Sequence, residues 1–173
     1  MRYQLTGDSP QEEQVLEIFP EARVMFDPFI PALSARALTA AARLGVFDAI
    51  GTKSHTVTEL ANTLSLDPDT LGLLVRVLAS AGYVSLENGM CSLTEPLRGS
   101  LLSDDPRSLS AWVRFNLIHW KIIENMEEVL KTGDGGDIYQ FLEDEDDWDV
   151  MQRAMLETAR PAAAGLAELI PVS

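Results

Sequence analysis

Residues 56–94 read TVTELANTLSLDPDTLGLLVRVLASAGYVSLENGMCSLT, and this stretch decides the fold. Thr56 is a capping residue at the start of a helix over residues 57–64. The Asp67-Pro68 step combines a capping acid with a first-turn proline before a second helix over residues 71–78. The sequence therefore predicts two consecutive helices joined by a short turn.

A predicted β-hairpin follows the second helix, which stops at Ala81-Gly82. Residues 83–86 and 90–93 are short strands, and the Asn88-Gly89 step between them supplies the positive φ angles that a tight hairpin turn needs. Helix, turn, helix and hairpin in this order are the elements of a winged helix. Because no other strand is predicted, the expected fold class is mainly α with one winged-helix-like unit.

The charge of the chain argues against DNA as the partner of this winged helix. The sequence has 13 lysines and arginines against 27 aspartates and glutamates, a formal net charge of -14. Binding to duplex DNA draws its affinity from cations that displace counterions from the phosphates. Arg76 is the one cation of the second helix, and Glu87 stands at the wing tip, where a groove-reading wing favours a cation. We therefore expect no nucleic-acid partner.

Length and composition indicate a protein that folds without disulfides and away from membranes. A chain of 173 residues can bury a sizeable core, and the single Cys91 can form no intramolecular bridge. No N-terminal signal segment is recognisable, and no apolar run approaches the roughly 20 residues that span a bilayer. The acidic balance also disfavours anionic membrane surfaces. We expect a cytoplasmic protein with no membrane partner.

Further helices are predicted before the winged-helix-like unit. An N-terminal helix begins at Ser9-Pro10 and is limited by Pro20. Residues 31–44 form an alanine-rich helix that Gly45 ends, and small side chains let this helix pack closely. Residues 46–50 are predicted to be a short helical turn that places apolar side chains under the winged-helix-like unit, and the alternative is that they only connect the two parts of the chain.

The C-terminal third is predicted to be helical and partly aromatic. Asp105-Pro106 begins a long helix that reaches Thr132 and has apolar side chains on more than one face. We expect this helix to be widely buried or shared with a partner. Another helix covers residues 149–158, and Pro161 starts a last helix that ends at Pro171.

Two segments of this third resemble ligand-binding motifs without matching them. The acids at positions 144, 146, 147 and 149 lack the central glycine and the terminal glutamate of a calcium loop, which favours a solvated helix start. Residues 133–136, GDGG, lack the preceding strand and the following lysine of a phosphate loop, which favours an ordinary loop. We therefore predict no metal site.

The order of these segments resembles the N-terminal half of the bacterial and plant small-molecule O-methyltransferases that use S-adenosylmethionine. Residues 41–50, AARLGVFDAI, are similar to that family's opening helix and its L-G-V/I-F-D step. Residues 73–82, LLVRVLASAG, look like its L-x-R-L-L-R-x-L-x-x-x-G segment. Weaker similarities to its T-x-x-E-L-A, W-x-x-L…T-G and F-x-x-A-M segments lie at residues 58–61, at Trp120 with residues 131–133, and at residues 151–155.

This resemblance implies a dimerisation region whose helices intertwine with those of a second copy and which supplies one wall of the acceptor-substrate pocket. In the family, S-adenosylmethionine binds to the other half, in a parallel-sheet domain with a D-x-G-x-G-x-G turn. No residue of this sequence matches that turn. S-adenosylmethionine is therefore expected only where a cofactor-binding domain is supplied, for example by a catalytic subunit in trans. We assign no catalytic, cofactor-binding or metal-binding residue, and we expect this chain to be inactive by itself.

Six side chains are candidates for lining the acceptor pocket that the resemblance implies. Aromatic and methionine side chains also suit a core or a dimer interface, and packing is the first interpretation for each. His119 is interpreted as a packed or partner-facing residue, and neither it nor His55, on an expected surface loop, completes a catalytic triad. The expected ligand is a small aromatic or polyketide-like molecule, and the candidates are Trp112, Phe115, His119, Trp120, Met151 and Met155.

The sequence thus predicts three segments: an N-terminal helical arm over 1–30, a winged-helix-like dimerisation unit over 31–104, and a helical extension over 105–173 that leads toward an absent cofactor-binding domain. The favoured function is the dimerisation and acceptor-wall portion of an O-methyltransferase-like protein. The alternative is a stand-alone small-molecule-binding or regulatory module derived from that family. A winged-helix transcription regulator is less favoured because of the charge.

Overall fold

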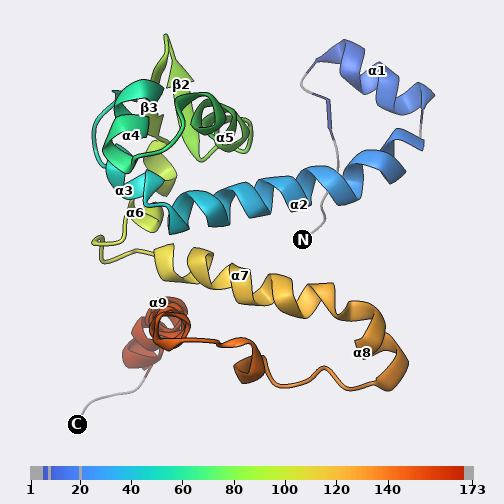
Figure 1. The fold of residues 1–173 in the computed structure, drawn as a ribbon, viewed down its shortest axis with the longest axis vertical. Helices are drawn as coiled ribbons and strands as arrows, with labels where there is room; N and C mark the ends of the chain where they lie inside the picture. The colour runs from blue at the N-terminus through green and yellow to red at the C-terminus, as the bar shows by residue number, and fades with distance from the viewer. Residues whose placement is uncertain (1–5, 8, 20, 170–173) are drawn as a thin grey trace. The chain divides into compact units, whose positions relative to one another are not determined.

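The computed structural model is mainly helical with one small sheet, which confirms the predicted fold class (Figure 1). The chain divides into two compact units, residues 1–37 and 38–173. The predicted helix limits at Pro20 and Pro171 lie outside the described residues. The structure describes residues 6–7, 9–19 and 21–169.

The first helix, α1 (Pro10–Ile18), begins where the sequence predicts. The Ser9 hydroxyl oxygen accepts a hydrogen bond from the backbone N–H of Glu12 at 3.2 Å. Pro10 occupies the first turn, where its missing N–H costs no helical hydrogen bond. The cap therefore satisfies a donor that the first turn leaves without a helical partner.

The second helix, α2 (Glu21–Arg43), is longer than predicted. The sequence places its start at Pro31, but the helix begins at Glu21 and contains both Pro28 and Pro31, so that prediction is wrong. A proline inside a helix removes its own N–H donor and bends the axis, but it leaves the other hydrogen bonds in place. A 23-residue helix therefore continues on both sides of its prolines.

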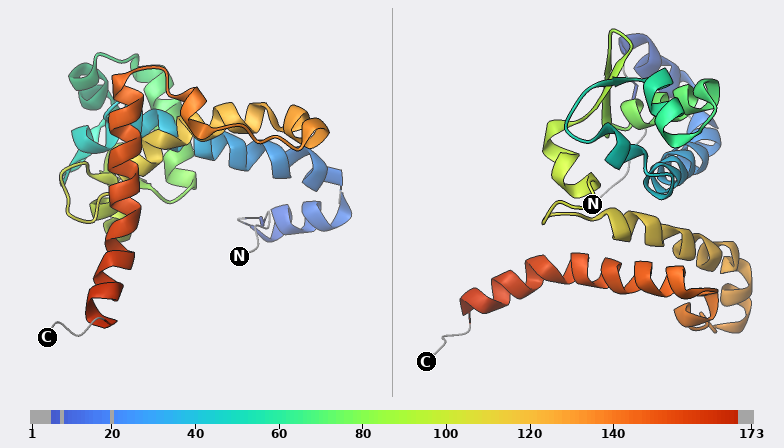
Figure 2. Two further views of the ribbon diagram at one scale, coloured as in Figure 1. Left: turned by 90° about the horizontal axis from the view of Figure 1, so that it is seen from below. Right: turned by 60° about the vertical axis from the view of Figure 1, so that its left-hand side comes forward.

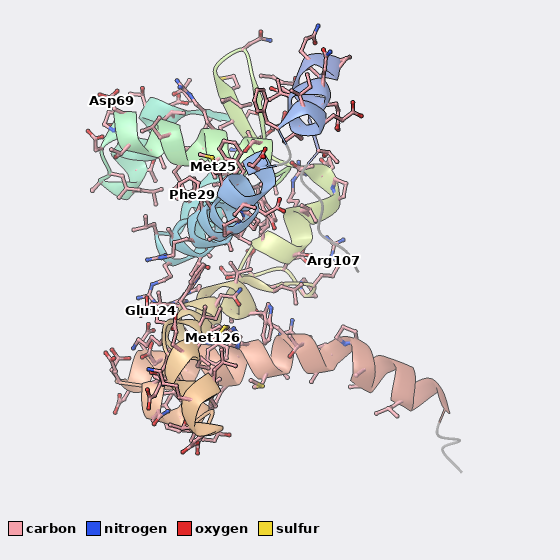
Figure 3. The ribbon with its side chains drawn as sticks, turned by 90° about the vertical axis from the view of Figure 1, so that its right-hand side faces the viewer. Met25, Phe29, Asp69, Arg107, Glu124 and Met126 are labelled. Atoms are coloured by element: carbon pink, nitrogen blue, oxygen red, sulfur yellow. The ribbon has the colours of Figure 1, made fainter. Side chains whose placement is uncertain are left out.

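The part of the chain before residue 38 exposes many large apolar side chains. Met25 and Phe29, both on α2, are 68% and 62% exposed (Figure 3). Exposed apolar side chains that gather into one patch mark an interaction site. Among the described residues of this unit the exposed apolar side chains are Val15, Ile18, Phe19, Val24, Met25, Phe26, Phe29, Ile30 and Leu33.

The helix-turn-helix of the second unit matches its prediction closely. α4 (Val57–Leu64) starts at Thr56, whose hydroxyl accepts from the Glu59 backbone N–H at 3.2 Å, while the Glu59 carboxylate accepts from the Thr56 N–H at 2.7 Å. α5 (Pro68–Ser80) starts at Asp67, whose carboxylate accepts from the Thr70 N–H at 2.9 Å. These local caps are the reason why the sequence locates both helices.

The hairpin is present, and a third strand joins it. β2 (Val84–Glu87) and β3 (Met90–Leu93) pair antiparallel across Asn88 and Gly89, whose φ angles are 52° and 77°. β1 (His55–Thr56) pairs with the other edge of β3, with His55 opposite Cys91, so His55 is not on a loop as predicted. A two-residue strand has no alternation that a sequence pattern could reveal.

The core of the winged-helix-like unit gathers side chains from every element around the sheet. α3 (Val46–Ile50) buries Val46, Phe47 and Ile50, as predicted for the helical turn at this position. Burial raises the pKa of the Cys91 thiol to about 11, so this cysteine is a protonated core residue. The other buried members are Ala41, Leu60, Ala61, Leu71, Val75, Leu78, Val84, Leu93 and Leu101.

The predicted long helix from residue 105 is in fact later and interrupted. After η1 (Glu95–Leu97) and α6 (Arg98–Leu101), the helix α7 (Ser110–Glu124) ends at Asn125, and α8 (Met126–Thr132) follows. Asp105 does not cap α7, because its carboxylate accepts hydrogen bonds from the backbone and the side chain of Arg107 instead.

The last helix, α9 (Glu145–Leu169), follows η2 (Ile138–Phe141) and crosses α7, against which it packs (Figure 2). The prediction of two helices separated at Pro161 is wrong, because α9 runs through this proline. The acidic run lies at its start, where Asp144 accepts from the Asp147 N–H at 2.9 Å, as expected for a helix start. Within the described ranges, no helix is both long and apolar enough to cross a membrane.

Two helix caps link the stability of the winged-helix-like unit to pH. Hydrogen bonds from Thr56 hold the pKa of Glu59 below its usual 4.5, and hydrogen bonds from Thr70 lower the pKa of Asp67 in the same way. A carboxyl whose folded pKa is lowered stabilises the fold above its unfolded pKa, and this stabilisation is lost as the pH falls through the folded pKa. We expect the melting temperature to fall from about pH 4.5 downwards.

The matched control for this pH dependence is the Glu59→Gln/Asp67→Asn double variant. Because its caps do not titrate, circular dichroism melts should show a shallower decline below pH 4.5 than in the wild type. Equal slopes for the two proteins would show that these caps do not couple stability to pH.

Candidate functional site

The candidate site lies where α7 and α9 pack together in the second unit. Phe115 is 1% exposed, and Met151 is 9% exposed in the same cluster. Both are therefore core residues, in agreement with packing as the first interpretation of these side chains. The remaining buried members are Ala111, Ile118, Leu142, Val150 and Ala154.

Three of the six candidate residues form an aromatic group on one face of α7. Trp112, Phe115 and His119 are spaced by three and four residues, which aligns side chains on a helix. The His119 ring meets Phe115 edge to face at 5.0 Å between centroids, and it meets Trp112 in the same manner at 5.4 Å. Since Trp112 and His119 are only half-buried, these two rings reach solvent from the edge of the core.

His119 is held in one orientation by a neighbour that sequence patterns did not single out. Its Nδ1 lies 3.0 Å from Oδ1 of Asn116, one helical turn earlier. Burial lowers the pKa of His119, which favours the neutral ring at pH 7. With Nδ1–H donating to the amide oxygen, the neutral tautomer leaves Nε2 as an acceptor, and Nε2 has no hydrogen-bond partner among the described residues.

The other candidates lie outside this aromatic group. Trp120 is half-buried and makes no ring contact with a described aromatic residue, although it follows His119 directly. Met155 is one turn beyond Met151 on α9 and is 48% exposed. Of the six side chains, Trp112, His119, Trp120 and Met155 thus have surface available to a ligand.

Glu157 is a further residue of this site that the sequence did not reveal. Its side chain is 7% exposed, and its two carboxylate oxygens accept from the backbone N–H groups of Ala111 at 3.2 Å and Trp112 at 2.8 Å. These donors belong to the first turn of α7, where the helix dipole stabilises an anion. Glu157 therefore caps α7 from another helix and fixes the position of Trp112.

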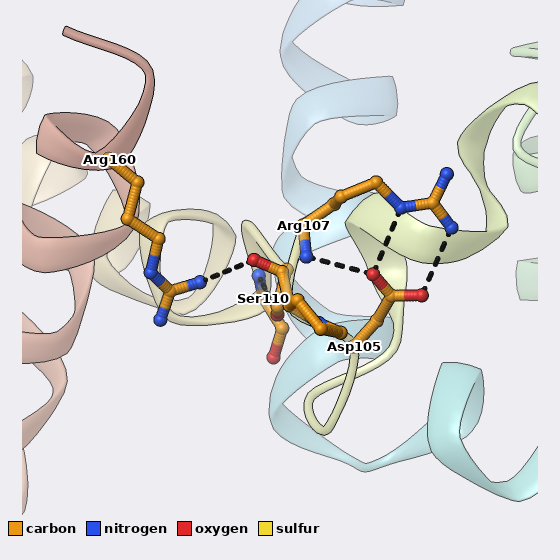
Figure 4. A network of polar contacts seen from close by, with 6 residues as sticks. Asp105, Arg107, Ser110 and Arg160 are labelled. Carbon is orange, nitrogen blue, oxygen red and sulfur yellow. Dashed lines mark hydrogen bonds and ion pairs between the residues drawn. The ribbon is translucent and has the colours of Figure 1, made fainter. Parts of the chain in front are cut away.

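The loop before α7 is tied to α9 by a second polar contact. Arg160 Nη1 donates to the Pro106 carbonyl oxygen at 2.9 Å, and Asp105 accepts from the backbone N–H of Arg107 at 2.8 Å (Figure 4). A cavity of about 330 Å³ lies here, with Glu157 and Arg160 in its wall. None of the six candidate residues lines it.

A second cavity lies at the break between α7 and α8. It has a volume of about 540 Å³ and is lined by Lys121, Glu124, Asn125, Gln140 and Phe141. Lys121 Nζ donates to Glu143 at 2.6 Å and to the Phe141 carbonyl oxygen at 3.3 Å, so its charge is already paired. The six candidates do not line this cavity either.

The described residues do not fit a nucleotide-type cofactor or a metal ion. The sheet consists of antiparallel strands of two to four residues, whereas a dinucleotide-type site needs a parallel strand that leads through a glycine-rich turn into a helix. In the same residues, no three His, Cys, Asp or Glu side chains gather closely enough to hold a metal.

The comparison with known families finds a match within the winged-helix-like unit. Residues 32–95 match the family model described as the O-methyltransferase dimerisation domain. This segment is similar to that domain. It covers the end of α2, the helices α3 to α5 and the three strands.

Two similar proteins are O-methyltransferases by name. The 3-O-methylredipecamine 2-O-methyltransferase IpeOMT3 of Carapichea ipecacuanha is 39% identical over 88 residues, which is 47% of this chain and 24% of that protein. The structure of the mitomycin 7-O-methyltransferase MmcR is 25% identical, with a TM-score of 0.73 over 90% of this chain and 49% of that one. The chain thus spans about half the length of that solved structure.

A third comparison concerns the fold alone. The structure of CalO1, a methyltransferase in calicheamicin biosynthesis in its SAH-bound form, is 23% identical, with a TM-score of 0.67 over 88% of this chain and 46% of that one. Because such similarity covers far more than residues 32–95, the helices that follow this segment also share the fold of these two structures.

Proposed function

We propose that this chain is the dimerisation and acceptor-binding portion of an S-adenosylmethionine-dependent O-methyltransferase that acts on a small aromatic molecule. The observation that carries the proposal is the match of residues 32–95 to the O-methyltransferase dimerisation-domain model, within a fold similarity that covers 90% of the chain. A cofactor-binding domain, in the same polypeptide or in trans, supplies the methyl donor. By themselves, these residues hold the acceptor without transferring a methyl group to it.

The exposed apolar side chains before residue 38 support a homodimer. Apolar surface gains roughly 25 cal/mol for each Å² removed from water, so a second copy that covers it stabilises both chains. Met25 and Phe29 are among the most exposed large side chains of α2. The proposed dimer buries them between the copies.

Sedimentation equilibrium tests the dimer directly. We expect a mass of twice 19.0 kDa for the wild type. The Met25→Lys/Phe29→Asp double variant should sediment as a monomer, because charges at a buried interface lose hydration without gaining a partner. Leu73→Asp, which places a charge at a 60% exposed site on α5, is the matched control and should stay dimeric. A wild-type monomer at high concentration would remove the dimer from the proposal.

The half-buried aromatic rings of α7 support binding of a flat acceptor. Trp112 offers a ring face, Met155 a flexible thioether, and His119 the Nε2 acceptor for a ligand hydroxyl. The relatives named above are methyltransferases of redipecamine and mitomycin compounds, and they agree with a small-molecule acceptor. The proposal therefore assigns acceptor contact to Trp112, His119, Trp120 and Met155, with Phe115 and Met151 behind them.

Tryptophan fluorescence tests this acceptor site. Titration with planar phenols should give a saturable change that His119→Ala and Met155→Ala each weaken about tenfold, equivalent to about 1.4 kcal/mol. Trp148→Phe, in which the ring stacked on Tyr139 at 5.6 Å is changed, should keep the wild-type affinity. Unsaturable quenching would argue against acceptor binding by this chain.

The same titration separates the proposal from a stand-alone binding module. Submicromolar affinity without any cofactor domain would favour the module, because a pocket wall completed by another domain binds weakly when alone. Incubation with methyl-labelled S-adenosylmethionine should leave the acceptor unlabelled. Transfer of label by this chain would contradict the assignment of methyl-donor binding to another domain.

A further inference from the structure

The turn at the tip of the hairpin places an amide side chain directly before a glycine. Asn88 and Gly89 connect β2 to β3, and both residues are exposed. The tip projects beyond the helices around it (Figure 1). Their φ angles of 52° and 77° are those that a two-residue turn requires and that asparagine and glycine tolerate. The fold therefore favours this pair of residues at a position that water reaches freely.

Neither functional group of this pair is occupied. The Asn88 side-chain amide has no hydrogen-bond partner among the described residues, and the Gly89 backbone N–H donates to none of their acceptors. A Cβ atom built on Gly89 would meet nothing within 4 Å, so the space beside the Gly89 nitrogen is open. The nitrogen of Gly89 can therefore approach the side-chain carbonyl carbon of Asn88 when the turn flexes.

The other three asparagines of the sequence have different surroundings. Asn62 and Asn116 lie inside α4 and α7, where helical hydrogen bonding fixes the backbone N–H that follows each of them. Asn125 lies between α7 and α8 and is followed by Met126, whose side chain crowds the nitrogen of its own residue. Asn88 is the one asparagine in the sequence that precedes a glycine.

We propose that Asn88 is a site of spontaneous deamidation. The Gly89 nitrogen bonds to Cγ of Asn88, the bond from Cγ to the side-chain nitrogen breaks, and ammonia leaves with the proton of the Gly89 N–H. Water then opens the cyclic succinimide that has formed. Opening at Cγ gives aspartate, whereas opening at the main-chain carbonyl gives isoaspartate, in which the chain continues through the former side chain. Either product adds one negative charge and needs no enzyme, cofactor or partner.

The isoaspartate product changes the geometry of the hairpin as well as its charge. Its main chain has an additional carbon atom before Gly89, so the turn no longer fits the pairing of Glu87 with Met90. The next pair of the ladder joins Leu86 to Cys91, which is fully buried. The new carboxylate also lies next to Glu87, and like charges repel. We therefore expect the isoaspartate form to melt at a lower temperature than the unmodified protein.

Peptide mapping by mass spectrometry tests the site in the full chain. After incubation at mildly alkaline pH, the peptide that contains Asn88 should gain about 1 Da and separate into two products. An endoprotease that cleaves before aspartate should cut only one of them, which distinguishes aspartate from isoaspartate. Peptides that contain the other asparagines should convert at least tenfold more slowly. Isomerisation at Asp134-Gly135 leaves the mass unchanged, so it cannot be mistaken for this reaction.

Two variants separate this reaction from other damage. Asn88→Gly keeps a residue that suits the turn but has no amide to lose, so its melting temperature should stay constant during the incubation that lowers the wild-type value. Gly89→Asn adds a Cβ atom beside the attacking nitrogen and still tolerates a positive φ, so deamidation of Asn88 should slow at least tenfold. Circular dichroism before incubation checks that both variants are folded.

Equal rates at all four asparagines would contradict the proposal, because the hairpin turn would then confer no reactivity. A Gly89→Asn variant that deamidates at Asn88 as fast as the wild type would exclude attack by the Gly89 nitrogen. If the melting temperature falls equally in the wild type and in Asn88→Gly, the modification does not weaken the hairpin, and that part of the inference is wrong.

Discussion

Glu157→Ala should lower the free energy of unfolding by about 3 kcal/mol, although the residue contacts no other charged side chain among those described. Its carboxylate accepts from the N–H groups of Ala111 and Trp112 in a site only 7% exposed. Alanine would leave both donors buried without a partner, and each such donor costs about 1–3 kcal/mol. The loss should appear as a lower midpoint in urea denaturation followed by tryptophan fluorescence.

Two control variants separate this cap from general damage to α9. Glu157→Gln keeps one acceptor oxygen, so it should lose roughly half as much stability as the alanine variant. Arg160→Ala, three residues later and exposed, removes one hydrogen bond to the Pro106 carbonyl and should cost about 1 kcal/mol or less. If Glu157→Ala unfolds at the wild-type midpoint, the buried carboxylate does not hold α7 in place.

The role of Glu157 also explains why the start of α7 was predicted incorrectly. The sequence favours Asp105-Pro106, which has a capping acid and a proline in the usual order. In the structure Asp105 accepts hydrogen bonds from Arg107, and the helix starts at Ser110 with a cap from Glu157, which lies 46 residues beyond Ala111. A sequence pattern detects caps within about three residues, and it cannot detect one that tertiary packing supplies.

The helices of the winged-helix-like unit were predictable because their signals are local. Thr56 and Glu59 are three residues apart, and Asn88-Gly89 sets its turn by backbone preference alone. The prolines of α2 and α9, by contrast, led to incorrect helix boundaries. Pro31 and Pro161 are strong boundary signals, yet both lie inside helices whose neighbouring hydrogen bonds and packing continue. The strength of a local signal therefore does not measure how firmly the surrounding structure holds a helix.

The sequence indicated the residue types of the candidate site, but not which of these side chains are buried and which are exposed. The sequence named Trp112, Phe115 and His119 as candidates, and the structure brings their rings together on one face of α7. Spacing could not tell that Phe115 points into the core while Met155 is half exposed, because this depends on how α9 packs. Asn116 was missed since an amide one turn from a histidine is a common helix neighbour.

The Phe115→Ala variant tests whether Phe115 is a core residue. It should destabilise the protein by about 4 kcal/mol. The Phe115 side chain is 1% exposed and lies in the cluster between α7 and α9. The centroid of its ring is 5.0 Å from that of His119. Alanine removes most of a buried aromatic side chain, and the cavity that remains adds to the lost transfer free energy. Thermal and urea unfolding should both show the loss.

Comparison with the Met155→Ala variant separates a loss of stability from a loss of acceptor binding. Met155 is 48% exposed, so its truncation should change stability by no more than about 0.5 kcal/mol while it weakens acceptor binding. Phe115→Leu, which keeps an apolar side chain of similar size, should recover most of the stability. If Phe115→Ala instead unfolds like the wild type but no longer binds planar phenols, Phe115 lines the acceptor pocket and is not a core residue.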